Sequence, residues 1–147
     1  MNRKPRVAFV CRDNTKHSQL GEALAKWYGQ DVIEAFSAGV EAGDGIEPEA
    51  ITAMQEVYQV DISQQQSPKV WHDLPEVDIV ISLNSDLSDN LPEEMSARYV
   101  EHWDIPDPEH DGSTYADTIE TLSEKVRYLI DLIIRGRYPI DEVDETE

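Results

Sequence analysis

Apolar runs alternate along the chain with segments of helical periodicity, and this alternation constrains the fold more than any other feature. Four short runs are typical of buried strands: residues 7–10, 32–36, 77–83 and, more weakly, 99–102. Three longer segments place apolar side chains on one face of a helix: residues 18–29, 47–58 and 115–135. This order predicts an α/β fold, a single three-layer domain whose four-stranded parallel sheet is flanked by helices.

The length of the chain, 147 residues, is that of one compact domain. We expect residues 1–138 to form this domain and the acidic residues 139–147 to form a tail. No apolar run approaches the ~20 residues that span a bilayer. The sequence therefore predicts a cytoplasmic protein that does not bind a membrane.

The charge of the chain argues against nucleic acid as a partner. Asp and Glu number 31 against 12 Lys and Arg, which gives a formal net charge of -19. Such an acid excess is typical of a highly soluble surface or of a saline habitat. Five of the basic residues nevertheless fall in the first sixteen positions, and we expect them to concentrate positive charge around Cys11: Arg3, Lys4, Arg6, Arg12 and Lys16.

The single cysteine, Cys11, follows the first predicted strand. One cysteine excludes an internal disulfide, a multi-cysteine zinc site and any relay of a disulfide between thiols of this chain. A polar loop follows Cys11, and Ser18 is the predicted N-cap of the next helix. Backbone N–H groups and a helix N-terminus at this place favour an anion and a thiolate. The alternative is an inert buried cysteine.

The carboxyl ends of parallel strands meet at one edge of a sheet, where ligands of such folds bind. Three loops leave these ends, after Val10, after Leu83 and after His102. We therefore expect the site to be built from these three loops.

The sequence after the first strand resembles a known family. Residues 10–22 read VCRDNTKHSQLGE, and in low-molecular-weight protein tyrosine phosphatases a cysteine in this place is followed after five residues by arginine and then serine. The resemblance is closer to the arsenate reductases that share their fold. It extends through Ser37-Ala38-Gly39, Asp61-Ile62-Ser63 and residues 102–108, and covers residues 6 to about 137.

The resemblance implies roles for several residues. Cys11 becomes the nucleophile and Asp107, in the Asp-Pro loop, the general acid, although an Asp-Pro pair can also simply form a turn. Tyr115 is expected to line the substrate mouth or to begin a surface helix. The remaining residues of the loop are expected to bind the anion, with Asn14 and Ser18 also orienting the thiolate: Arg12, Asn14, Thr15, Lys16 and Ser18.

The chain departs from the family pattern at four positions. His17 replaces the loop arginine, and Asp13 replaces a loop glycine. Asn84 and Leu91 occupy positions where the thiol-relay arsenate reductases have further cysteines, so no internal relay is expected. Histidine replaces part of the arginine's function only when protonated. We therefore predict that His17 is a third catalytic residue, beside Cys11 and Asp107, and that the reaction rate is highest on the acid side of neutral pH.

Three functions remain open from the sequence. The first is hydrolysis of phosphotyrosine or small aryl phosphates through a Cys11 phospho-enzyme. The second is arsenate reduction completed by a small thiol or a separate redoxin, and the third is a non-catalytic homologue that binds an oxyanion or a protein. No cofactor and no metal are expected, because the spacing of four candidate ligands is uninformative: His102, Asp104, Asp107 and His110.

Overall fold

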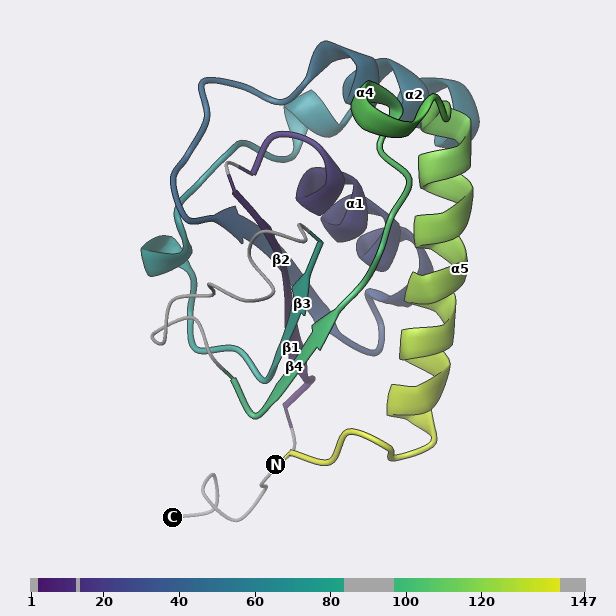
Figure 1. Cartoon of the computed structure of the whole chain (residues 1–147). Coiled ribbons are helices and arrows are strands. Elements are labelled where there is room, and N and C mark those ends of the chain that lie inside the picture. The colour runs from purple at the N-terminus through teal and green to yellow at the C-terminus, as the bar shows by residue number, and fades with distance from the viewer. Residues whose placement is uncertain (1–2, 13, 84–96, 141–147) are drawn as a thin grey trace.

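Four parallel strands form one sheet in the order β2-β1-β3-β4 (Figure 1). The computed structural model describes residues 3–12, 14–83 and 97–140. The strands are β1 (Arg6–Cys11), β2 (Glu34–Gly39), β3 (Ile79–Ser82) and β4 (Tyr99–His102). All three pairings are parallel, which confirms the predicted α/β fold with its four-stranded sheet.

The helices follow the strands in the predicted alternation. They are α1 (His17–Gly29), α2 (Pro48–Tyr58), the single turn α4 (Pro108–Asp111) and α5 (Tyr115–Ile134). Two short 3-10 turns, η1 (Ile62–Gln64) and η2 (Trp71–Asp73), lie between α2 and β3. In Figure 1, α1 and α5 cover one face of the sheet, and α2 and α4 lie near the N-terminal end of α5.

Alternate residues of β1 are buried on opposite faces of the sheet. Val7 and Phe9 enter the larger core cluster, which is completed by side chains of α1, α2 and α5. Ala8 and Val10 enter a smaller cluster, against which Trp71 of η2 packs. A strand covered on both faces has to be apolar at every position, which explains the continuous run at residues 7–10.

Two predicted boundaries were wrong. β2 extends beyond the predicted end at Phe36 to Gly39, because Gly39 pairs with Cys11 in the parallel ladder. Lys16, and not Ser18, is the N-cap of α1. Ser18 is therefore inside the helix, and its hydroxyl is available for a contact outside the helix backbone.

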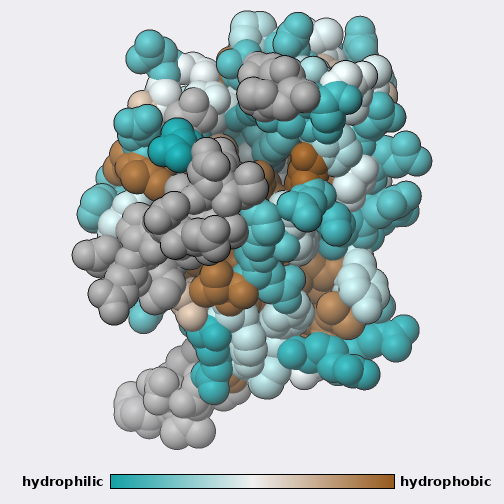
Figure 2. Space-filling model, viewed as in Figure 1, coloured by the Kyte–Doolittle hydropathy of each residue, from teal (hydrophilic) through white to brown (hydrophobic). Residues whose placement is uncertain are grey.

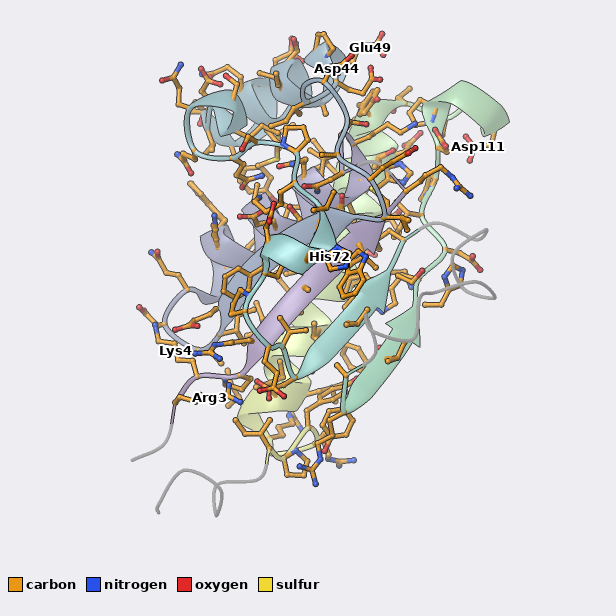
Figure 3. The ribbon with its side chains drawn as sticks, turned by 90° about the vertical axis from the view of Figure 1, so that its left-hand side faces the viewer. Arg3, Lys4, Asp44, Glu49, His72 and Asp111 are labelled. Carbon is orange, nitrogen blue, oxygen red and sulfur yellow. The ribbon has the colours of Figure 1, made fainter. Side chains whose placement is uncertain are left out.

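The expected cluster of positive charge around Cys11 was also wrong for three of its five members. Arg3, Lys4 and Arg6 lie at the N-terminal end of β1, where Arg3 forms two hydrogen bonds of 2.7 and 2.8 Å with the Asp78 carboxylate. Five residue steps along β1 separate Arg6 from Cys11, a distance of roughly 17 Å. Figure 3 shows Arg3 and Lys4 at one end of the molecule and Asp111 at the other.

The chain after α5 returns to the free edge of β4. The Tyr99 hydroxyl donates a 2.6 Å hydrogen bond to the Pro139 carbonyl, and the Tyr138 hydroxyl donates to Glu101. Burial and the neighbouring Glu101 carboxylate raise the pKa of Tyr138 above its ordinary value. The predicted acidic tail lies outside the described residues from residue 141 onward.

Hydrophilic side chains cover most of the described face in Figure 2, with small apolar patches between them. Among the described residues, no helix combines the length and apolar character that a membrane span requires.

Candidate active site

Cys11 is the last residue of β1 and is 7% exposed. Its Sγ lies 2.8 Å from Oγ of Ser18, and the Asn14 side-chain amide donates a 2.8 Å hydrogen bond to the same oxygen. Because the Ser18 oxygen accepts from Asn14, its own hydrogen can point to sulfur. These two contacts place Asn14 and Ser18 beside the sulfur, where the family resemblance predicts that they orient a thiolate.

Asn14 holds the loop in a conformation that few residues adopt. Its φ is 61°, in the left-handed region that asparagine tolerates, and its side chain is completely buried. The Asn14 carbonyl accepts a 2.8 Å hydrogen bond from the Gln19 side chain, and its Oδ1 accepts one of 2.9 Å from the Lys69 backbone N–H. The loop is therefore fixed by α1 and by the segment before η2.

The end of β2 also packs against this loop. A Cβ on Gly39 would lie 2.7 Å from the Arg12 carbonyl oxygen and 2.9 Å from the Asn14 nitrogen, so only glycine fits. The Glu41 N–H donates a 3.1 Å hydrogen bond to the same Arg12 carbonyl. The site was predicted to consist of three other loops, so the contributions of the β2 end and of Lys69 were not predicted. Gly39 could have indicated this contact in the sequence, since a glycine at a strand end often marks a close approach of another backbone segment.

His17 occupies the family arginine's position as the first residue of α1 and is 6% exposed. Thr15 is buried, and its carbonyl accepts a 2.8 Å hydrogen bond from the Glu47 N–H. Arg12 is exposed. Asp13 lies outside the described residues.

An ion pair joins the cysteine loop to the Asp-Pro loop. Nζ of Lys16 lies 3.0 Å from Oδ1 of Asp107, and the two side chains are 17% and 26% exposed. The structure therefore brings together the loops that follow β1 and β4, two of the three predicted components. The third, after β3, falls in residues 84–96, with Asn84 and Leu91, outside the described residues.

The Asp-Pro loop is held by hydrogen bonds from both sides. The Asp107 N–H donates to Asp111 at 3.0 Å, and the Thr118 hydroxyl of α5 donates to the Pro106 carbonyl at 2.8 Å. The side-chain hydroxyl and the N–H of Ser113, together with the Asp107 N–H, lower the pKa of Asp111 below its ordinary value.

The remaining candidates are placed as follows. Tyr115 is half-buried as the first residue of α5 and packs against the larger core cluster. Nε2 of His102 lies 3.2 Å from Asp104. Over the part of the chain that the structure describes, no group of three or more His, Cys, Asp or Glu residues could hold a metal ion.

Comparison with known proteins identifies the family. A family model described as low molecular weight phosphotyrosine protein phosphatase matches residues 6–137. The chain belongs to this family. The resemblance inferred from the cysteine loop is therefore confirmed.

Relatives within the family include several arsenate reductases. The arsenate reductase of Bacillus subtilis (strain 168) is 40% identical over 105 residues, which cover 69% of this chain and 73% of that protein. The solved structure of an arsenate reductase in reduced state is 33% identical and covers 88% of this chain and 98% of its own, with a TM-score of 0.71.

A phosphatase of the family shares the same fold. The low molecular weight protein tyrosine phosphatase from Streptococcus pyogenes is 20% identical and covers 97% of this chain and 98% of its own, with a TM-score of 0.72. The fold of this chain is thus shared by an arsenate reductase and by a low molecular weight protein tyrosine phosphatase.

Proposed function

We propose that this protein reduces arsenate, with Cys11 as the nucleophile and an external thiol as the electron source. The observation that carries the proposal is the hydrogen-bonded group of Cys11, Ser18 and Asn14 at the carboxyl end of β1. It supports a thiolate directed into a loop of backbone N–H groups. The arsenate reductases among the relatives favour this function over phosphate-ester hydrolysis, the first of the three expectations from the sequence.

The first step is attack of the Cys11 thiolate on the arsenic atom. A sulfur–arsenic bond forms, and one arsenic–oxygen bond breaks. The departing oxygen takes up a proton and leaves as water, and arsenic remains in the +5 state. The Ser18 hydroxyl lowers the energy of the attacking thiolate, while the N–H groups of the loop bind the oxygens that remain on arsenic.

The second step requires a thiol from another molecule, because the chain contains one cysteine. This thiol attacks the Cys11 sulfur, forms a disulfide with it and displaces arsenic, which keeps the electron pair of the broken bond and leaves as arsenite. A second external thiol then attacks the mixed disulfide, releases the Cys11 thiol and forms an external disulfide. Two thiols are oxidised for each arsenate reduced. A small thiol or a redoxin supplies both.

Hydrolysis of aryl phosphates is the second candidate, and the position of Asp107 favours it. The ion pair with Lys16 ties Asp107 to the cysteine loop, near where a leaving oxygen would be protonated. We rank this candidate below arsenate reduction because the curated relatives include arsenate reductases that are 36–40% identical to this chain.

The test measures arsenite formation by the purified protein with arsenate and either glutathione with glutaredoxin or a thioredoxin system. We expect turnover with at least one thiol source and, when the thiol is limiting, a mixed disulfide at Cys11 detected by mass spectrometry. A parallel assay follows release of phenol from an aryl phosphate.

The Cys11→Ser variant is the control in both assays. Arsenite formation equal to that of this variant with every thiol source would overturn the proposal. Aryl phosphate turnover that needs Cys11, without arsenite formation, would establish the second candidate instead.

A further inference from the structure

The ion pair between Lys16 and Asp107 has a consequence for how the site takes up its ligand. We propose that Lys16 is the cation that binds the oxyanion and that Asp107 competes with the oxyanion for this ammonium group. In the empty site Lys16 is paired with Asp107, and on binding it transfers to an oxygen of the anion. The inference rests on the proposed function, because it requires that the cysteine loop binds an oxyanion.

The position of Lys16 supports this role. It is the residue before His17 in the cysteine loop and the N-cap of α1, and its side chain is 17% exposed. Nζ of Lys16 is 3.0 Å from a carboxylate oxygen of Asp107, on a loop 91 residues away in the sequence. If Asp107 is in reach of a ligand bound at Cys11, an ammonium group one hydrogen bond away is also in reach. The four-carbon stem of lysine allows the small shift from one oxygen to another.

Three other basic residues are less suited to binding the oxyanion. Arg3 and Arg6 are paired with Asp78 and Glu34 at the far end of β1. His17 is 6% exposed, and an imidazole carries positive charge only when protonated. Lysine is charged throughout the physiological pH range. The chain thus places a permanent cation beside the position where the family has arginine.

Competition follows from charge and burial. A partly buried ammonium group requires an acceptor, and Asp107 supplies it while the site is empty. Phosphate and arsenate carry up to two negative charges near neutral pH and attract the ammonium more strongly than one carboxylate does. Asp107 therefore weakens anion binding in two ways, by holding Lys16 and by repelling the anion.

The experiment measures binding of inorganic phosphate to the full chain by NMR titration, which also detects millimolar affinities. We expect Asp107→Asn to bind phosphate about tenfold more tightly than the unaltered protein, since a charge-assisted hydrogen bond is released to the ligand. Lys16→Met should bind about tenfold more weakly, and Lys16→Arg should restore binding. In the double variant, Lys16→Met should remove most of the gain from Asp107→Asn.

The matched control is Asp104→Asn, which removes one negative charge from the same segment at a carboxylate that is 94% exposed. If the ion pair only held the two loops together, Asp107→Asn would bind phosphate more weakly than the unaltered protein or with the same affinity as Asp104→Asn. Either result would overturn the inference. Should Lys16→Met not fold, the sign of the Asp107→Asn effect still decides.

Two negative results separate the inference from the proposed function. Phosphate binding that is indifferent to Lys16 and Asp107 overturns the inference and leaves an oxyanion site that arsenate can use. Absence of phosphate binding in the unaltered protein and in all variants overturns both.

Discussion

The two ends of β1 use charge in opposite ways. At the N-terminal end, the Asp78 carboxylate accepts two hydrogen bonds from the Arg3 guanidinium and one of 2.8 Å from the Arg6 N–H. At the carboxyl end, Cys11 contacts Ser18, and an ion pair joins Lys16 of the following loop to Asp107 on another loop. At the N-terminal end, the charged groups bind one another and fasten the chain. At the carboxyl end, the Lys16 ammonium group can leave Asp107 and bind a ligand instead.

The chain has only 12 Lys and Arg against 31 Asp and Glu, and its basic residues at the two ends of β1 serve different purposes. Three basic residues at the N-terminal end fasten the first residues of the chain to the sheet: Arg3, Lys4 and Arg6. Lys16, at the carboxyl end, belongs to the loop that follows Cys11. We expect substitutions at one end to change stability and substitutions at the other to change chemistry.

The largest effect is expected for Cys11→Ser at the carboxyl end. A serine hydroxyl is a far weaker nucleophile than a thiolate, so arsenite formation should fall at least about 10³-fold. The free energy of unfolding, measured in urea, should change by no more than about 1 kcal/mol because the two side chains are similar in size. A variant with normal turnover would show that the chemistry does not occur at this end of β1.

The next largest effect is expected for Asp78→Ala at the N-terminal end. This change removes the shared acceptor of the Arg3 side chain and the Arg6 N–H and should lower the free energy of unfolding by about 2 kcal/mol. Turnover per folded molecule should be unchanged. Glu34→Ala is the control, since it removes an exposed partner of Arg6 and should cost less than about 0.5 kcal/mol. Equal losses in both variants would contradict the assignment.

The same carboxylate predicts a pH dependence. Burial alone would raise the pKa of Asp78, but hydrogen bonds from the Arg3 side chain and the Arg6 N–H, with the charges of both arginines, lower it below its ordinary value. Its contribution to stability is therefore complete above the unfolded-state pKa of about 3.9 and is lost as the pH falls through the lower folded-state value. Asp78→Ala should show a smaller loss of stability over this acid range than the unaltered protein.

Ser18→Ala sharpens the comparison at the carboxyl end. Without the hydroxyl, the Cys11 thiolate loses its donor, and the rate of alkylation of Cys11 by iodoacetamide at neutral pH should fall about tenfold. Ser18→Thr keeps a hydroxyl group and should retain most of the rate if the added methyl group is accommodated. Equal rates for Ser18→Ala and the unaltered protein would mean that the hydroxyl does not stabilise the thiolate.

The smallest effect is expected for Lys4→Ala. The Lys4 ammonium donates a 2.8 Å hydrogen bond to the Gln30 carbonyl at an exposed position, so its loss should cost less than about 0.5 kcal/mol. Arsenite formation should not change, whereas Lys16→Ala, the same substitution at the other end, should lower it about tenfold. A comparable loss of activity in both variants would abolish the distinction between the two ends.

The sequence predicted the fold and the family better than the local geometry. The apolar run before Cys11 correctly placed this cysteine at the end of a strand, because a strand buried on both faces has an unmistakable pattern. Ser18 was predicted as the N-cap, but the N-cap is Lys16, so the helix begins two residues earlier than predicted, at His17. That small shift gives the Ser18 hydroxyl to Cys11, and helix boundaries are the part of a sequence pattern that local propensity defines least.

The sequence by itself determined the alternation of strands and helices, the position of Cys11 and the absence of a second thiol in the chain. Each depends on residue types within one short window or on a count over the chain. Only the tertiary structure decided that Arg3 and Arg6 lie far from Cys11, that Gly39 packs on the Arg12 carbonyl and that Lys16 pairs with Asp107. The reason is that these contacts depend on strand direction and on the order β2-β1-β3-β4, which bring together residues that no local pattern connects.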